Sequence, residues 1–166
     1  SPLYITYAYN DGPVESITST VAGLVAFIRS DLHIINSYNV GNVNAQTFEA
    51  GGLVGQTNGY FLTVINSYNK GIASATKDSL VDGFISRLGS DVVEVNLDNA
   101  FYPSTSVSAN GEANGATAAT AQEFTDLSLA KKLHDYNKNG IYGDGWGQDA
   151  GDDYPRFKTD VVQARS

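Results

Sequence analysis

The sequence contains no cysteine among its 166 residues and only 10 basic residues against 18 acidic ones. Without cysteine, disulfides, thiolate nucleophiles and cysteine-built zinc sites are excluded. The formal net charge of -8 argues against nucleic acid and anionic membranes as partners, because contacts to phosphate need clustered Lys and Arg. The chain also has no apolar run of about 18 residues, so we expect no membrane insertion by this segment.

Methionine is absent as well, and the chain begins Ser1-Pro2-Leu3. Its first strand-like segment, residues 3–9, begins in the middle of a repeat. We therefore expect this segment to belong to a larger polypeptide.

Hydrophobic residues make up 42% of the chain, which is enough for a folded core. The 17 glycines and 10 tyrosines indicate a β protein that is rich in turns. The length is that of one domain, or of a repeat array with a cap.

A Tyr-Asn-x-Gly pattern occurs three times, beginning at Tyr9, Tyr38 and Tyr68, so that the copies are 29 and 30 residues apart. A second pattern follows each copy at a similar distance, as Ala22–Val25, Gly51–Gly55 and Asp82–Ile85. Two patterns that recur together indicate a structural repeat.

Residues 3–110 have no helical periodicity, and each repeat holds short strand-like runs between Gly and Asn turns. This predicts a mainly β fold, a parallel β-helix (β-solenoid) of about three to four coils with a C-terminal helix and loop cap. A β-sandwich or barrel is the alternative, but it does not explain the joint recurrence of both patterns.

Equivalent residues of stacked coils lie about 4.8 Å apart. We therefore expect equivalent side chains to form ladders and equivalent apolar residues to fill the interior, while glycine supplies the positive φ of tight corners. The predicted structural repeat residues are Tyr9, Tyr38 and Tyr68 (aromatic ladder), Asn10, Asn39 and Asn69 (amide ladder), and Gly52, Leu53 and Val54 (second pattern and interior).

The predicted domains are β-helical repeats over residues 1–103, a linker or loop over 104–119, and a helical and acidic-loop cap over 120–166. Within the first range, the copies lie near 4–33, 34–63 and 64–97, with a degraded copy from 98. Thr120 and Glu123 match a capping box, and the apolar stripe that follows predicts a helix over 120–135, broken near Asp126. We expect this helix to cover the last coil, whose unpaired edge is an aggregation hazard.

The Gly51–Gly55 pattern together with Asn66-Ser67-Tyr68-Asn69 resembles the GLUG-motif repeats of bacterial surface and secreted proteins. Such repeats end in a helix, a Trp-containing segment and a Tyr-Pro-x-Leu-like terminator. This chain has Trp146 and Tyr154–Phe157, with Phe in place of Leu. The first and third copies depart from the motif, because Ala26 replaces its closing Gly and Phe84-Ile85-Ser86 replaces Leu-Val-Gly.

The resemblance covers most of residues 4–158 and implies a right-handed β-helix in an adhesin-like or protease-associated extracellular region, without catalytic residues. We expect a non-catalytic structural or adhesin-type module, extracellular or at the cell surface. The alternatives are a module that binds carbohydrate or a host surface ligand, and an accessory region of a secreted protease whose active site lies outside this chain.

An acidic segment near the C-terminus contains half of a calcium-loop pattern, Asp135-x-Asn137-x-Asn139-Gly140. Trp146 occupies the position of the bidentate Glu, so the missing oxygens would come from further along the chain. The candidate calcium ligands are Asp135, Asn137, Asn139, Asp144 and Asp149. A solvated acidic loop explains the same residues, since Asn, Asp and Gly also form ordinary turns.

No arrangement of residues indicates catalysis. His33 and His134 are far apart in sequence and match no metalloprotease pattern. Asp78, Asp82 and Arg87 lie in one repeat, but scattered surface charge explains them equally well.

Aromatic residues outside the ladder are the candidates for contact with a sugar or another ligand. They are Tyr60, Phe61, Tyr102, Tyr142, Trp146 and Tyr154. The ladder tyrosines, by contrast, are expected to pack ring on ring.

Overall fold

The computed structural model describes residues 1–77 and 81–158. The chain divides into two compact units, Ser1–Ala118 and Ala119–Ser166. The first unit is a parallel β-solenoid of about three coils, which confirms the predicted fold and not the sandwich. In the described part of the chain, no helix has the length and apolarity needed to cross a bilayer.

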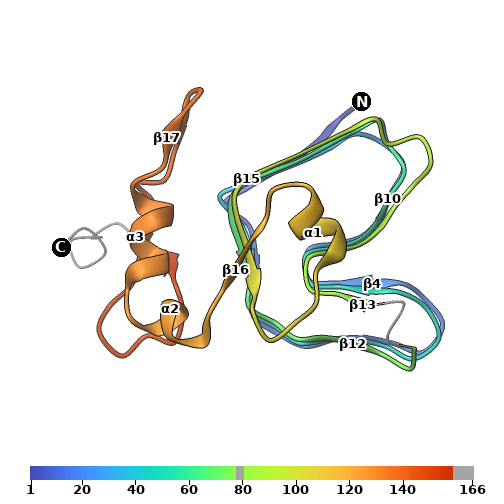
Figure 1. Ribbon diagram of the computed structural model, residues 1–166, viewed down its shortest axis with the longest axis horizontal. Helices are drawn as coiled ribbons and strands as arrows, with labels where there is room; N and C mark the ends of the chain where they lie inside the picture. Colours follow the sequence, from blue (N-terminus) through green and yellow to red (C-terminus); the bar gives the residue numbers. More distant parts are fainter. Residues whose placement is uncertain (78–80, 159–166) are drawn as a thin grey trace. The chain divides into compact units, whose positions relative to one another are not determined.

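Each coil consists of short strands that bend around the solenoid axis, and Figure 1 shows the successive coils superimposed in a view along the stack. Equivalent strands of neighbouring coils form four sheets. The first contains β1 (Leu3–Thr6), β2 (Tyr9–Asn10), β6 (Leu32–Ile35), β7 (Tyr38–Asn39), β11 (Phe61–Asn69), β15 (Glu94–Pro103) and β16 (Thr117–Ala119). The others are β3 (Val14–Ser16), β8 (Val43–Ala45) and β12 (Ala73–Ala75); β4 (Val21–Ala22), β9 (Ala50–Gly51) and β13 (Val81–Asp82); and β5 (Val25–Ile28), β10 (Val54–Thr57) and β14 (Ile85–Leu88).

The register of the strands places the repeated residues directly above one another. Leu32 pairs with Leu3 on one side and with Leu62 on the other. Val54 likewise lies between Val25 and Ile85. Because the strands of successive coils pair in parallel, the interior fills with rows of equivalent apolar side chains. Leu53, Val54 and their equivalents Phe84 and Ile85 are fully buried, as predicted.

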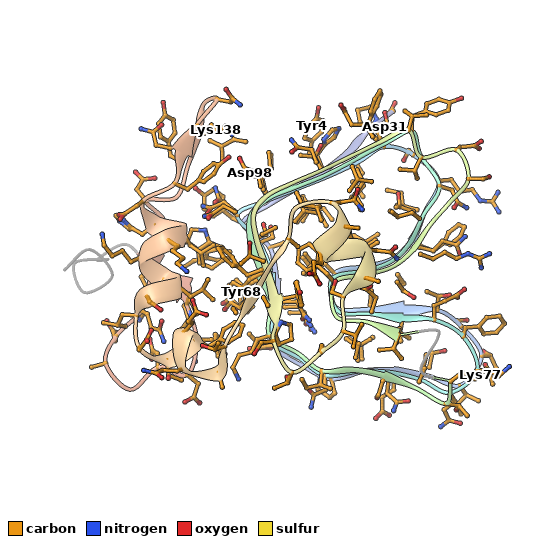
Figure 2. All side chains as sticks on the ribbon, viewed as in Figure 1. Tyr4, Asp31, Tyr68, Lys77, Asp98 and Lys138 are labelled. Atoms are coloured by element: carbon orange, nitrogen blue, oxygen red, sulfur yellow. The ribbon has the colours of Figure 1, made fainter. Side chains whose placement is uncertain are left out.

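Both predicted ladders are present at one corner of the coil. The rings of Tyr9 and Tyr38 stack with centroids 5.2 Å apart, and those of Tyr38 and Tyr68 with centroids 5.1 Å apart. Tyr68, labelled in Figure 2, is completely buried. The amide of Asn10 donates to Asn39 Oδ1 at 2.8 Å, and Asn39 donates to Asn69 Oδ1 at the same distance.

A second asparagine ladder, which the sequence analysis missed, lies three residues earlier. Asn66 donates to Asn36 Oδ1 at 2.7 Å, and Asn99 donates to Asn66 Oδ1 at 2.7 Å. Their φ angles are 48°, 52° and 49° for Asn36, Asn66 and Asn99, so these residues provide the left-handed bend. Asparagine tolerates this conformation better than other residues with a side chain.

The prediction that glycine supplies the positive φ at the corners is wrong. None of Gly12, Gly41 and Gly71 has a φ in the left-handed region. Glycine is required because the coils approach closely: a Cβ on Gly41 would lie 1.9 Å from Gly12 O, and one on Gly71 would lie 1.9 Å from Gly41 O.

The third coil is covered within the first unit by α1 (Ala109–Ala113), which lies in the 104–119 stretch predicted as a linker or loop. Asp82 of the third coil pairs with Gly51, the equivalent residue of the second coil. Its carboxylate accepts hydrogen bonds from Ser108 Oγ at 2.7 Å and from Asn110 N at 3.1 Å. Gly111 packs close to Phe84 at the end of the core. This stretch is folded because Asp82, distant in sequence, provides partners for the first turn of α1.

Where one helix was predicted over 120–135, the structure has two short helices, α2 (Ala121–Thr125) and α3 (Ser128–His134). The predicted capping box of Thr120 and Glu123 is formed. The break follows Asp126, as predicted, because Leu127 adopts a φ of 71° and Asp126 accepts a hydrogen bond from Ser128 N.

Two strand pairs follow the helices in the described part of the second unit, which ends at residue 158. β17 (Asn137–Lys138) and β18 (Ile141–Tyr142) form an antiparallel hairpin. β19 (Trp146–Gly147) pairs with β20 (Arg156–Phe157), and the ring of Trp146 lies 4.7 Å from that of Phe157.

Candidate functional site

The structure separates the predicted aromatic contact residues into exposed, half-buried and buried side chains. Tyr60, Phe61 and Tyr142 are exposed, with 62%, 41% and 54% of their surface accessible. Tyr154 is half-buried, and the guanidinium of Arg156 lies 4.3 Å from the centre of its ring.

Tyr102 and Trp146 are wrong as candidates for ligand contact, because both are buried. Trp146 is wholly enclosed in the second unit against Phe157. Tyr102 packs in the solenoid core, where its hydroxyl donates to Glu112 at 3.4 Å. Burial raises the pKa of Tyr102, and the nearby charge of Glu112 raises it further.

Three of the predicted calcium ligands, Asp135, Asn137 and Asn139, lie in an ion pair or in a β-hairpin. Asp135 Oδ2 accepts from Lys131 Nζ at 2.6 Å, and this hydrogen bond is the main reason why the pKa of Asp135 is lowered. Asn137 lies in the β17–β18 hairpin. Asn139 and Gly140 have φ angles of 53° and 78°, which form the tight turn of that hairpin.

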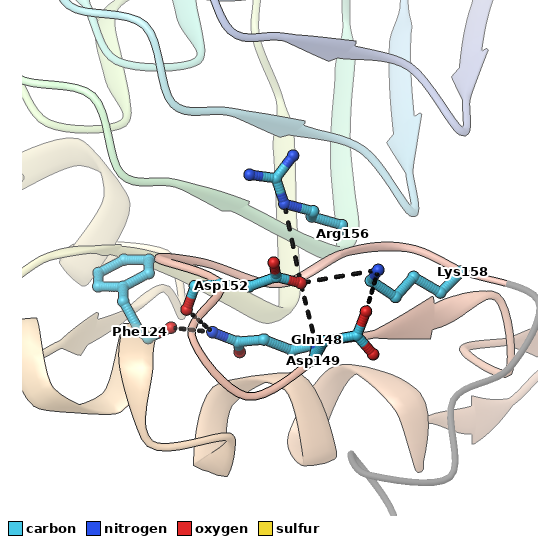
Figure 3. A network of polar contacts seen from close by, with 6 residues as sticks. All are labelled: Phe124, Gln148, Asp149, Asp152, Arg156 and Lys158. Carbon is cyan, nitrogen blue, oxygen red and sulfur yellow. Dashed lines mark hydrogen bonds and ion pairs between the residues drawn. The ribbon is translucent and has the colours of Figure 1, made fainter.

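The other two predicted calcium ligands lie further along the chain. Asp144 is exposed, whereas Asp149 Oδ2 accepts from Lys158 Nζ at 2.8 Å (Figure 3). In the same network, the buried Gln148 donates to the carbonyl oxygens of Phe124 and Asp152, which holds this loop against the second unit's own core. Among residues 1–77 and 81–158, no three His, Asp or Glu side chains are arranged to hold a metal ion. A calcium site stays a prediction that these contacts do not support.

The sequence analysis missed a groove on the solenoid that combines exposed aromatic rings with charged side chains. It measures about 600 Å³ and is lined by exposed rings of Phe27 and Phe48 and by Thr20, Glu49, Gln56 and Arg87. We call it the Phe27–Phe48 groove. The register places Phe27, Gln56 and Arg87 side by side on β5, β10 and β14, so one row of the groove crosses three coils.

Glu49 is the fixed polar group of this groove, with only 11% of its side chain exposed. Its Oε1 accepts from Arg87 Nη1 at 3.0 Å, and its Oε2 accepts from Thr20 Oγ1 at 2.8 Å. Burial alone would raise the pKa of Glu49, but the hydrogen bonds from Thr20, from its own backbone and from Arg87 outweigh burial and lower it. The carboxylate is therefore ionised at neutral pH, and each of its oxygens keeps acceptor capacity for a ligand.

Of the residues considered for catalysis, the two described ones, Asp82 and Arg87, have separate partners. Asp82 is buried beneath α1, and Arg87 extends to Glu49 of the neighbouring coil. Asp78 lies outside the described residues. His33 stacks on Tyr4 at 4.5 Å on the first sheet, whereas His134 ends α3 in the second unit.

Sequence signals for the groove were weak. Arg87 and Glu49 are 38 residues apart, which is not a repeat spacing. Within the row, the three coils place Phe, Gln and Arg at equivalent positions, so no repeated residue marks them. Aligning the copies and searching for positions that vary in type while their neighbours stay apolar would have singled out this row.

Comparisons with known proteins identify no relative. No protein-family model matches the chain, and neither a curated protein nor a solved structure matches it. The resemblance to GLUG-motif repeats therefore depends on the quoted motif residues alone.

Proposed function

We propose that this chain is a non-catalytic, adhesin-type structural module of a larger bacterial surface or secreted protein, related to the GLUG-motif repeats. The observation that carries the proposal is the continuity of the ladders from coil to coil. Rings of Tyr9, Tyr38 and Tyr68 stack at nearly constant spacing, with interplanar angles of 10° and 6°.

This continuity suits a module that maintains a fixed spacing. In the parallel sheets, the main-chain hydrogen bonds run between coils and therefore along the stack. The buried amides of Asn39 and Asn69 add side-chain hydrogen bonds in the same direction. Bending or shearing the stack must break many of these bonds together, which makes the solenoid stiff.

The location of the protein is tested with an antibody raised against this chain. We expect the antibody to label intact cells that produce the protein, or to detect the protein in their culture medium. Labelling that appears only after the cells are permeabilised would overturn the extracellular role.

The mechanical role is tested by pulling the folded chain in optical tweezers. The native sequence lacks cysteine, so Tyr4→Cys and Val107→Cys create two unique attachment points at exposed positions, 61% and 79% accessible. Each coil of 29 or 30 residues should release about 100 Å of chain when it detaches. Discrete steps of this size are expected, whereas smooth extension at low force would refute a module that resists a pulling force.

A further inference from the structure

The Phe27–Phe48 groove has the composition of a ligand site and not of a packing defect. Its two rings are 46% and 48% exposed, and they flank an ion pair that is built into the solenoid. Single exposed apolar residues are common on protein surfaces, but two aromatic rings beside a nearly buried carboxylate are the combination found in small-molecule pockets.

From this combination we propose that the Phe27–Phe48 groove binds a neutral polysaccharide chain. A sugar ring presents apolar C–H faces, which pack on aromatic rings, and hydroxyl groups at its edge. Phe27 and Phe48 offer the rings. Glu49 offers acceptors, and the guanidinium of Arg87, whose side chain is 61% exposed, offers donors. This proposal is independent of the mechanical role.

Charge favours a neutral ligand over an acidic one. The positive charge of Arg87 is balanced by Glu49 at 3.0 Å. The chain as a whole carries a net charge of -8, which repels sulfated or uronic-acid polymers. The lining of the groove thus pairs one cation with one carboxylate, and Arg29, whose guanidinium lies 5.6 Å from the centre of the Phe27 ring, adds one positive charge beside it. A sulfated polymer needs several cations along its length, so this arrangement suits a neutral chain better.

The shape favours a polymer over a single sugar. A second hollow of about 470 Å³, lined by Asn58, Ser90 and Asp91, shares Gln56 and Arg87 with the groove. The two hollows therefore adjoin along the outer face of β10 and β14. A chain of several sugars can occupy both, with stacking in the first and hydrogen bonds in the second.

Fixed geometry further supports binding at this site. Thr20, Glu49 and Arg87 come from three successive coils and are connected by two hydrogen bonds. The polar groups are thus held in place before a ligand arrives, which reduces the entropy that binding costs.

The test is affinity gel electrophoresis in gels that contain the neutral polymers laminarin, lichenan or galactomannan, with heparin as the polyanionic probe. We expect at least one neutral polymer to retard the full chain and heparin not to. The double variant Phe27→Ala/Phe48→Ala should weaken this retardation about tenfold or more, which corresponds to about 1.4 kcal/mol.

Ile72→Ala is the matched control, because it removes another exposed apolar side chain, 45% accessible, that does not line the groove. Circular dichroism spectra of both variants should match the native protein, since the removed side chains lie on the surface. The proposal is overturned if no neutral polymer retards the chain, if only heparin does, or if Ile72→Ala weakens binding as much as the double variant.

Discussion

Replacing Asn39 by alanine should destabilise the solenoid far more than the same replacement one coil earlier, at Asn10. Asn39 is fully buried. Its amide nitrogen donates to the carbonyl oxygens of Gly41 and Gly52, and its Oδ1 accepts from Gly41 N at 3.1 Å. It also connects the two neighbouring asparagines of the ladder.

The expected magnitude follows from the groups that lose a partner. Asn39→Ala leaves the buried N–H and C=O of Gly41 without the hydrogen bonds they make to this side chain. An unsatisfied buried group costs about 1–3 kcal/mol, so the two together cost about 4 kcal/mol. Asn10→Ala removes the equivalent bonds to Gly12, but Gly12 is half-exposed and reaches water, so we expect about 1 kcal/mol.

The free energy of unfolding is measured by urea denaturation with near-ultraviolet circular dichroism, which follows the stacked tyrosines of the solenoid. Fluorescence of Trp146, the only tryptophan, follows the second unit in the same samples. If Asn39→Ala destabilises the tyrosine transition by no more than Asn10→Ala does, the ladder is not a stabilising element and the reasoning is refuted.

Three further predictions concern close packing, the cap and pH. Gly41→Ala should lower the free energy of unfolding by at least about 2 kcal/mol in urea denaturation, because the added Cβ would collide with a main-chain carbonyl. Gly12→Ala should change it by less than about 0.5 kcal/mol, because the nearest atom to that Cβ is 4.0 Å away, and equal effects of the two variants would contradict the close-approach explanation. Asp82→Ala removes the partner of two buried backbone N–H groups and of α1, so we expect a loss of about 3 kcal/mol and increased association in light scattering. Replacement of the exposed Asp91 by alanine should leave both the stability and the light scattering of the native protein unchanged. The pKa of Glu49 is lower in the folded protein than its ordinary value of 4.5. The ionised carboxylate therefore contributes its full stabilisation above pH 4.5, and this contribution is lost as the pH falls through the lowered pKa. Glu49→Gln should reduce the slope of melting temperature against pH on the acid side, and an unchanged slope would contradict this.

Repeated residues made the fold predictable. Once equivalent tyrosines and asparagines recur at a constant offset, stacking is the arrangement that satisfies all of them together. The Tyr38 and Asn39 positions were therefore identified correctly from sequence. The second ladder at Asn36 was missed because its first-coil equivalent is Tyr7, which breaks the visible pattern while adopting the same left-handed bend, with a φ of 51°.

The cap and the groove were not predictable for a different reason. Residues 104–119 have the composition of a loop, and α1 forms because the side chain of Asp82 accepts hydrogen bonds from its first turn. The groove likewise depends on side chains from three coils, such as Thr20, Glu49 and Arg87, that share no motif. The partners in these contacts are far apart in the sequence, so the contacts become apparent only when the fold is known.

Glycine illustrates the limit of residue-type reasoning. Glycine was expected to be required at position 41 because of a positive φ, but the φ of Gly41 is not in the left-handed region. The actual reason is the short distance between Gly41 and the carbonyl oxygen of Gly12 in the preceding coil. A pattern can therefore locate a required glycine without revealing what requires it.

The asparagine bend has a consequence for how such a protein changes in length. Asn36 and Asn66 are 30 residues apart, have nearly the same backbone conformation and bond to each other. Joining Ile35 directly to Asn66 would remove one whole turn and bring every remaining row into contact with an equivalent row. A cut that shifted one strand by a single residue against its neighbour would instead turn the apolar side chains of that strand toward water. The segments between strands absorb small differences in coil length, because the copies are 29 and 30 residues apart and stay in register. The reach of the molecule is therefore set by its number of complete turns, which makes it a countable quantity.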